Sequence, residues 1–342
     1  MSFDPSAAAR PGSGVFGLPH GEADASVVLV PVPFEATTSH GRGAARGPSA
    51  ILEASRQVDL FDVETGRPYE AGIHMLALPP EIVALDAAAR PDALRVIAAG
   101  GVRADDPALA RAAARVDAAS GQMNAWVREQ VERLLGARKR VGVVGGDHSV
   151  AFGSIAAHAD AYPGLGLLHV DAHCDLRRAY EGFEDSHASV LYNVMERLPS
   201  VARLVQVGIR DVSDEEVAYA EGSGGRVIVH HDALLASARF EGETWGAQVR
   251  RILAPLPRDV YLTFDVDGLD PTLCPHTGTP VPGGLTFQQA SALLAGIAKS
   301  GRRLVGFDLA EVAPGDDGAG WDGNVGARLL YKMIGWMLKS SE

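Results

Sequence analysis

Short apolar runs alternate with longer helical stretches along this chain, and this alternation constrains the fold more than any other feature. The runs are rich in aliphatic residues and lie at 26–30, 140–144, 165–170, 203–209, 226–229, 260–266 and 303–309. Between them, 108–135 and 287–299 have the apolar spacing of helices, and Pro48 lies near the start of another. We therefore expect an α/β fold in which a parallel sheet carries helices on both faces, as a three-layer α/β/α arrangement.

The length predicts one large domain. The chain has 342 residues, 46% of them hydrophobic, which is enough to bury a sizeable core. Residues 1–25 are rich in Ala, Gly and Pro and are expected to form a flexible N-terminal segment, so that 26–342 is the single catalytic domain. The segment 79–106 is rich in Ala and Pro with weak periodicity, and we expect a surface excursion without an assigned function.

Charge and composition exclude several classes of partner. The formal net charge of −12 and the absence of a basic patch argue against nucleic acid. No apolar stretch is long enough to span a bilayer, so no membrane partner is expected. Two cysteines cannot form a disulfide scaffold for a chain of this length, which favours a cytoplasmic location. Cys174 alternates away from its acidic neighbours and is expected to be a buried thiol rather than a metal ligand.

Potential metal ligands follow three of the apolar runs. Alternation points Asp171 and His173 to one side of a strand end, and a slight curl returns Asp175 towards them. Asp265 and Asp267 repeat this arrangement at another strand end, and a third run leads through Gly145-Gly146 to Asp147 and His148. Ligands in open α/β sheets collect beyond the carboxyl ends of the strands, so these side chains are expected to meet.

Each acid or histidine taken alone has a simpler explanation, as a helix cap, a turn residue or a hydrogen-bonded side chain. The set is harder to explain in this way. Several carboxylates gathered at one sheet edge repel each other unless a cation neutralises them, so the combined pattern predicts a metal centre.

The same stretches resemble the signatures of the ureohydrolase (arginase and agmatinase) family. They are Gly145-Gly146-Asp147-His148-Ser149, Asp171-Ala172-His173-Cys174-Asp175 and the run from Phe264 to Pro271, and Thr277-Gly278-Thr279-Pro280 is most similar to agmatinases. The resemblance implies two divalent metal ions per chain, most simply Mn²⁺, with Zn²⁺, Fe²⁺, Co²⁺ and Ni²⁺ left open. One ion would be held by His148, Asp171, Asp175 and Asp265, and the other by Asp171, His173, Asp265 and Asp267.

The resemblance also implies the catalytic residues. A water activated by two metals would attack the guanidinium carbon, with Asp175 holding that water and helping to move its proton. Glu311 matches the family residue that orients the guanidinium, although it also fits a solvated loop acid. His187 lies where the family keeps a proton-transferring histidine, but Ala188 stands where many members have Gly, so an ordinary surface histidine is the alternative.

The substrate is less constrained by sequence. The stretch 176–185 lacks the Asn- and Ser-containing loop with which arginases hold an amino acid, which disfavours arginine. Glu181, Glu184 and Asp185 favour a second positive charge, as in agmatine, whereas Arg177 and Arg178 suit a carboxylate, as in guanidinobutyrate or formimidoylglutamate. We expect agmatine to be converted to putrescine and urea.

Other family activities, a single-metal zinc deacetylase of similar fold and a non-enzymatic binding protein are the alternatives. By the habit of the family, a homo-oligomer is expected, as a trimer or hexamer.

Overall fold

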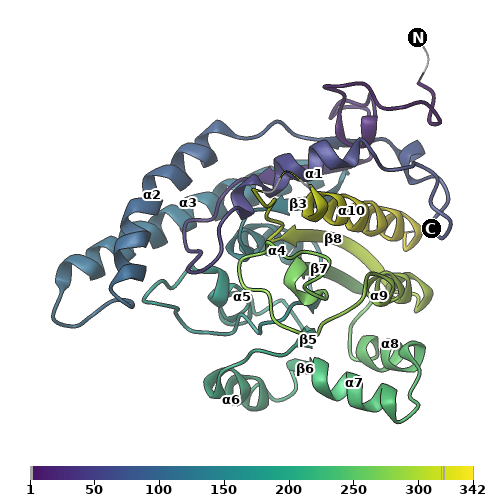
Figure 1. Ribbon diagram of the computed structural model, residues 1–342. Coiled ribbons are helices and arrows are strands. Elements are labelled where there is room, and N and C mark those ends of the chain that lie inside the picture. Colours follow the sequence, from purple (N-terminus) through teal and green to yellow (C-terminus); the bar gives the residue numbers. More distant parts are fainter. Residues whose placement is uncertain (1–2, 317, 319, 342) are drawn as a thin grey trace.

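The computed structural model describes residues 3–316, 318 and 320–341, and its centre is one eight-stranded sheet in which all strand pairs are parallel (Figure 1). The strand order is β2-β1-β3-β8-β7-β4-β5-β6. The strands are β1 (Val27–Val32), β2 (Ile73–Met75), β3 (Arg140–Gly145), β4 (Gly166–Val170), β5 (Arg203–Ile209), β6 (Val227–His231), β7 (Asp259–Asp265) and β8 (Arg303–Ala310). The expected parallel sheet is confirmed. The sequence prediction did not include β2, because this strand is too short to show an apolar period.

Helices cover both faces of the sheet, as expected for three layers (Figure 1). One layer contains α1 (Gly47–Ser55), α7 (Asp232–Phe240), α8 (Trp245–Leu253), α9 (Phe287–Lys299) and α10 (Trp321–Lys339). The other contains α2 (Pro80–Ala98), α3 (Pro107–Gly136), α4 (Ala151–Ala161), α5 (Val190–Arg197) and α6 (Asp214–Gly222). Successive residues of one strand serve opposite layers: Leu29 packs with the first layer and Val28 with the second.

The segment 79–106 is largely helical, which differs from the expected irregular excursion. It forms α2, which packs along α3 and buries Ala89, Ala93 and Val96 on one stripe. The stripe consists mainly of alanine, so its apolar period is weak in the sequence although its spacing is helical. Pro91 lies inside this helix. Packing against α3 therefore stabilises a helix that the apolar periodicity of the sequence indicates only weakly.

Part of the segment 1–25, for which the sequence predicts flexibility, packs against the domain. Val15, Phe16 and Leu18 are buried in the core beneath α1 and α10. The backbone N–H of Phe16 donates to the Ser55 hydroxyl at 2.9 Å, which links this segment to the end of α1. Among the residues whose placement is described, no helix combines the length and apolarity needed to cross a membrane.

The strand order brings separate parts of the chain to one edge. β3, β8, β7 and β4 are consecutive in the middle of the sheet, although they are far apart in sequence. Because all of them are parallel, their carboxyl ends meet at the same edge. The loop after β1 and the loop after β5 flank this group. The expected ligands lie on these central strand ends.

Candidate active site

The loop from β3 to α4 positions His148. A Cβ on Gly146 would lie 1.8 Å from the carbonyl oxygen of Phe34, so the close approach of these two backbones requires glycine. Asp147 then caps the short 3-10 helix His148–Val150 by accepting the N–H of Ser149. This local geometry places the imidazole of His148 in the core of the site, where the side chain is 1% exposed.

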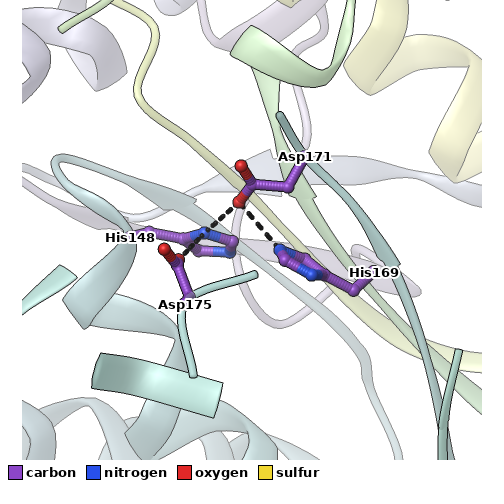
Figure 2. Close-up of side chains that lie close together, drawn as sticks. All are labelled: His148, His169, Asp171 and Asp175. Carbon is purple, nitrogen blue, oxygen red and sulfur yellow. Dashed lines mark hydrogen bonds and ion pairs between the residues drawn. The ribbon is translucent and has the colours of Figure 1, made fainter. Parts of the chain in front are cut away.

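His148 faces two carboxylates from the end of β4. Its Nδ1 lies 3.1 Å from Oδ2 of Asp171 and 3.0 Å from Oδ2 of Asp175, as Figure 2 shows. On the other side of the ring, Nε2 contacts the Thr263 hydroxyl at 2.8 Å, and that hydroxyl donates to Asp308 at 2.9 Å. The Thr263 oxygen therefore accepts a hydrogen bond from Nε2–H, and Nδ1 of His148 faces the two carboxylates. Positive charge between Nδ1 and the carboxylates, supplied by a proton or by a metal ion, stabilises this arrangement.

His173 forms a second group beside the first. Its Nδ1 lies 3.0 Å from Oδ2 of Asp267 and 3.4 Å from Oδ1 of Asp171. Asp171 thus directs one oxygen towards each histidine. Asp265 contributes Oδ2 at 3.7 Å from Nδ1 of His148, while its other oxygen accepts the N–H of Asp267 at 2.8 Å. The structure therefore brings all six expected ligands to one strand-end cluster.

The carboxylates of this cluster are buried and close to one another, which opposes their ionisation. Burial, followed by the charges of Asp267 and Asp171, raises the pKa of Asp265 well above its usual value. Burial and the charge of Asp171 raise the pKa of Asp175 to about 6. Burial also acts to raise the pKa of Asp171, but three surrounding histidines outweigh it and hold that pKa well below the usual range. Such a cluster binds positive charge.

The donor atoms are spaced to hold divalent ions. One group, His148, His169, Asp171 and Asp175, has its donor atoms within 4.8 Å of one another, and so has a second group, Asp171, His173 and Asp267. The two groups share Asp171 and offer only imidazole nitrogens and carboxylate oxygens, which suit borderline to hard divalent metals. The residues therefore fit two metal ions, and the zinc deacetylase pattern of a single metal fits less well.

The sequence prediction did not include His169, which contacts the cluster. It lies on β4, and its Nε2 contacts Oδ2 of Asp171 at 2.8 Å (Figure 2). Gln206 on β5 approaches its Nδ1 at 2.9 Å. The period of two along a strand places His169, Asp171 and His173 on one side, so extending that alternation backwards from Asp171 indicates this residue.

Glu311 follows β8 and presents one free oxygen. Its Oε1 accepts the backbone N–H of His148 at 3.0 Å, whereas its buried Oε2 has no hydrogen-bond partner among the described residues. Burial, followed by the charge of Asp147, raises its pKa well above the usual value. Both Glu311 and Asp175 have a left-handed backbone, with φ of 63° and 55°. Non-glycine residues in this conformation often mark functional sites, where the surrounding structure holds them in place.

His187 also reaches the cluster, from the 3-10 helix His187–Ser189. Its Nδ1 contacts the hydroxyl of Thr37 at 3.1 Å, and the ring of Tyr180 lies edge-on at 6.0 Å between centroids. Burial, followed by the charges of His173 and His148, lowers the pKa of His187 to about 4, so this imidazole is neutral at pH 7. His187 is half-buried and lines the cavity, so it differs from an ordinary surface histidine.

A cavity of about 430 Å³ opens onto these residues. Its wall also includes Arg177, Tyr180, Asp211 and Glu216. Nε of Arg177 lies 3.7 Å from Glu216, and its guanidinium lies over the Tyr180 ring at 5.1 Å. Asp211 is the more exposed acid, with its side chain 70% exposed, and its Oδ2 lies 4.0 Å from Nε2 of His173.

Several charged residues that the sequence proposed for substrate selection do not line this cavity. They are Arg178, Glu181, Glu184 and Asp185. Asp185 instead pairs with Arg197 at 2.8 Å. Between Tyr180 and His187 the chain turns Glu181, Glu184 and Asp185 away from the cavity, and local sequence does not show that turn. His276 contacts Asp322 of α10 at 2.8 Å, and Cys174 is buried with a raised pKa of its thiol because of that burial.

Comparison with known proteins agrees with this geometry. A family model described as the arginase family matches residues 25–335. An N(1)-aminopropylagmatine ureohydrolase of Thermus thermophilus is 36% identical over 314 residues, which cover 91% of this chain and 90% of that protein. An agmatinase of Cronobacter sakazakii is 33% identical over 92% of this chain and 88% of that protein. The solved agmatine ureohydrolase of Thermoplasma volcanium has a similar fold, with a TM-score of 0.70, 24% identity and coverage of 94% and 92%. The chain belongs to the arginase family.

Proposed function

We propose that this chain is an agmatinase-like hydrolase that converts agmatine and water to putrescine and urea. As a member of the arginase family, the chain is a hydrolase of carbon–nitrogen bonds in linear amidines. The observation that carries the choice of a guanidino substrate is the buried Oε2 of Glu311, which has no hydrogen-bond partner among the described residues and lies in the same cavity as the candidate metal ligands. A planar guanidinium offers forked N–H donors that match such a carboxylate.

The proposed ligands are those expected from the sequence. His148, Asp171, Asp175 and Asp265 would hold one ion, and Asp171, His173, Asp265 and Asp267 the other. The contacts of Asp171 with both histidines support its bridging role. Mn²⁺ suits a set of four carboxylates with one imidazole for each ion. His169 would orient Asp171 through the contact at 2.8 Å.

Two divalent ions, when bound, lower the pKa of the water that serves as nucleophile. Asp175, which would be a ligand of one ion, would hold this water and accept its proton. Glu311 holds the guanidinium with its carbon facing the attacking oxygen. His187 would pass the proton that Asp175 took from the water to the leaving nitrogen, which departs as the amine of putrescine while the carbon leaves as urea.

The charges on the cavity wall favour a substrate with a cationic tail. Arg177 and Glu216 lie close enough to offset each other's charge. Asp211 then adds a negative charge at the cavity wall. Agmatine ends in an ammonium group, whereas guanidinobutyrate and formimidoylglutamate end in carboxylates that Asp211 would repel. Specificity for agmatine is therefore proposed to depend on Asp211 rather than on Glu181, Glu184 or Asp185.

A second candidate substrate is N(1)-aminopropylagmatine, the compound in the name of the Thermus thermophilus relative. The cavity of about 430 Å³ offers room for a polyamine tail longer than that of agmatine. Such a substrate keeps the guanidinium and adds positive charge at the same wall. Glu311 and Asp211 would have the same roles with either compound.

For the assembly and the location, the proposals are the expectations from the sequence. We propose a homo-oligomer, as a trimer or hexamer, in the cytoplasm. Soluble enzymes of this size commonly form closed symmetric assemblies. The net charge of −12 does not prevent this, because exposed charges are screened over roughly 8 Å at physiological salt.

The test is a urea-release assay on the Mn²⁺-loaded protein with agmatine, N(1)-aminopropylagmatine, arginine, guanidinobutyrate, guanidinopropionate and free guanidine. Ammonia and formamide readouts cover formimidoylglutamate. We expect the highest kcat/KM with agmatine or its aminopropyl derivative. A preference for a carboxylate-ended compound would contradict the proposed substrate, and no product from any compound would favour a non-enzymatic member of the family.

A further inference from the structure

The loop after β1 places a threonine hydroxyl directly behind His187. Thr37 is fully buried, and its Oγ1 lies 3.1 Å from Nδ1 of His187 and 3.3 Å from the backbone nitrogen of the same residue. The hydroxyl also donates to Oδ2 of Asp147 at 3.1 Å. One oxygen atom thus contacts both the ring and the backbone of the histidine that we propose as the proton carrier.

The chemistry of a hydroxyl sets the direction of these bonds. It has one hydrogen and two lone pairs. The carboxylate of Asp147 accepts that hydrogen on Oδ2, since its Oδ1 is engaged by the N–H and hydroxyl of Ser149. The two lone pairs of Thr37 are then left to accept the backbone N–H and the Nδ1–H of His187. This arrangement leaves the lone pair of His187 on Nε2, the ring nitrogen that does not contact Thr37.

The position of Thr37 is itself fixed from α2. Nη1 of Arg90, which is 7% exposed, donates to the carbonyl oxygens of Ala36 at 2.9 Å and Thr38 at 2.8 Å, on either side of Thr37. Glu35 closes the same loop by accepting the N–H of Gly43 at 2.7 Å. The segment 79–106, to which the sequence assigned no function, therefore supports the wall of the active site through Arg90.

We infer that Thr37 is a positioning residue that holds His187 as the Nδ1–H tautomer and presents Nε2 to the reacting atoms. The inference rests on the proposed role of His187 in proton transfer. A general acid or base contributes about 10²- to 10⁴-fold to rate when it is correctly placed. Loss of the hydroxyl should forfeit part of that factor without removing a group that binds the substrate.

The test compares Thr37→Val, which keeps the shape and removes the hydroxyl, with Thr37→Ser, which keeps the hydroxyl. With agmatine and saturating Mn²⁺, Thr37→Val should lower kcat roughly ten- to a hundredfold with little change in KM, because part of the proton-transfer factor is lost. Thr37→Ser should restore most of that loss. Thr38→Val is the matched control: its hydroxyl donates to the carbonyl of Glu35 at 2.5 Å, in the same loop and without contact to His187.

A double-mutant cycle separates this role from general loop damage. If Thr37 acts through His187, Thr37→Val should cause no further loss of kcat in a His187→Gln background. Equal losses in both backgrounds, or full kcat in Thr37→Val alone, would overturn the inference. A wild-type protein that releases no urea from agmatine would instead count against the proposed substrate, and the cycle then uses the compound that is turned over.

Discussion

Replacing Glu311 with Gln separates guanidinium binding from metal binding. In Glu311→Gln, the amide oxygen can still accept the N–H of His148, which now binds Oε1 at 3.0 Å. The amide NH₂ then takes the place of Oε2, which is buried and has no partner among the described residues. An NH₂ group is a donor, so it cannot accept a hydrogen bond from the guanidinium N–H groups. The lost charge-assisted hydrogen bond is worth about 1.5–3 kcal/mol. We expect kcat/KM for agmatine to fall by roughly 10- to 150-fold or more, since about 1.4 kcal/mol corresponds to a tenfold change.

The same variant should lose activity without losing thermal stability. Burial raises the pKa of Glu311 above its value in the unfolded chain. As pH rises from the unfolded pKa towards the folded pKa, the unfolded chain ionises first, and the free energy of unfolding decreases. A neutral Gln removes that cost at pH 7. After chelator treatment, the melting temperature of Glu311→Gln should therefore equal or exceed that of the wild type.

Glu181 offers a matched control. It also has a left-handed backbone, with φ of 54°, a buried Oε2 without a described partner and a pKa raised by burial, but it does not line the cavity. Glu181→Gln should keep wild-type kcat/KM. The assay is urea release, with elemental analysis of bound metal. Unchanged kinetics in fully metal-loaded Glu311→Gln would refute the assignment of guanidinium binding to Glu311, and loss of metal would assign this residue to the metal centre.

Three further predictions concern the metals, the substrate tail and the assembly. Asp265→Asn should lose metal and activity together, because this carboxylate is proposed to belong to both coordination spheres; full metal content with normal turnover would exclude the proposed ligand set. Asp211→Asn should raise KM for agmatine several-fold and lower it for guanidinobutyrate, whereas Glu215→Gln, which removes the same charge from the exposed first turn of α6, should change neither. Equal effects of the two variants would contradict the role of Asp211. Light scattering after size exclusion should give the mass of a trimer or hexamer of the 35.9 kDa chain, and a monomer mass at all concentrations would contradict the proposed assembly.

The sequence by itself determined most of the strands and the chemical type of the site. Strands that are buried on both faces are continuous apolar runs, so they are visible without a structure. The acids and histidines stand immediately after those runs, and the period of two shows which of them share a side. Local geometry is enough for Asp171 and His173 or for Asp265 and Asp267, because each pair belongs to one strand end.

The tertiary structure decided which strand ends meet and which loop residues surround them. The order β3-β8-β7-β4 results from packing between segments far apart in sequence, and no local period encodes it. The same long-range packing brings Thr37 behind His187 and Asp211 to the cavity wall, while it turns Glu184 and Asp185 away. Arg90 reaches the site only because α2 packs along α3 beside the loop after β1. Spacing along the chain predicts which strand or helix a residue belongs to and which side of it the residue occupies. Contacts between elements determine which residues are neighbours in the site.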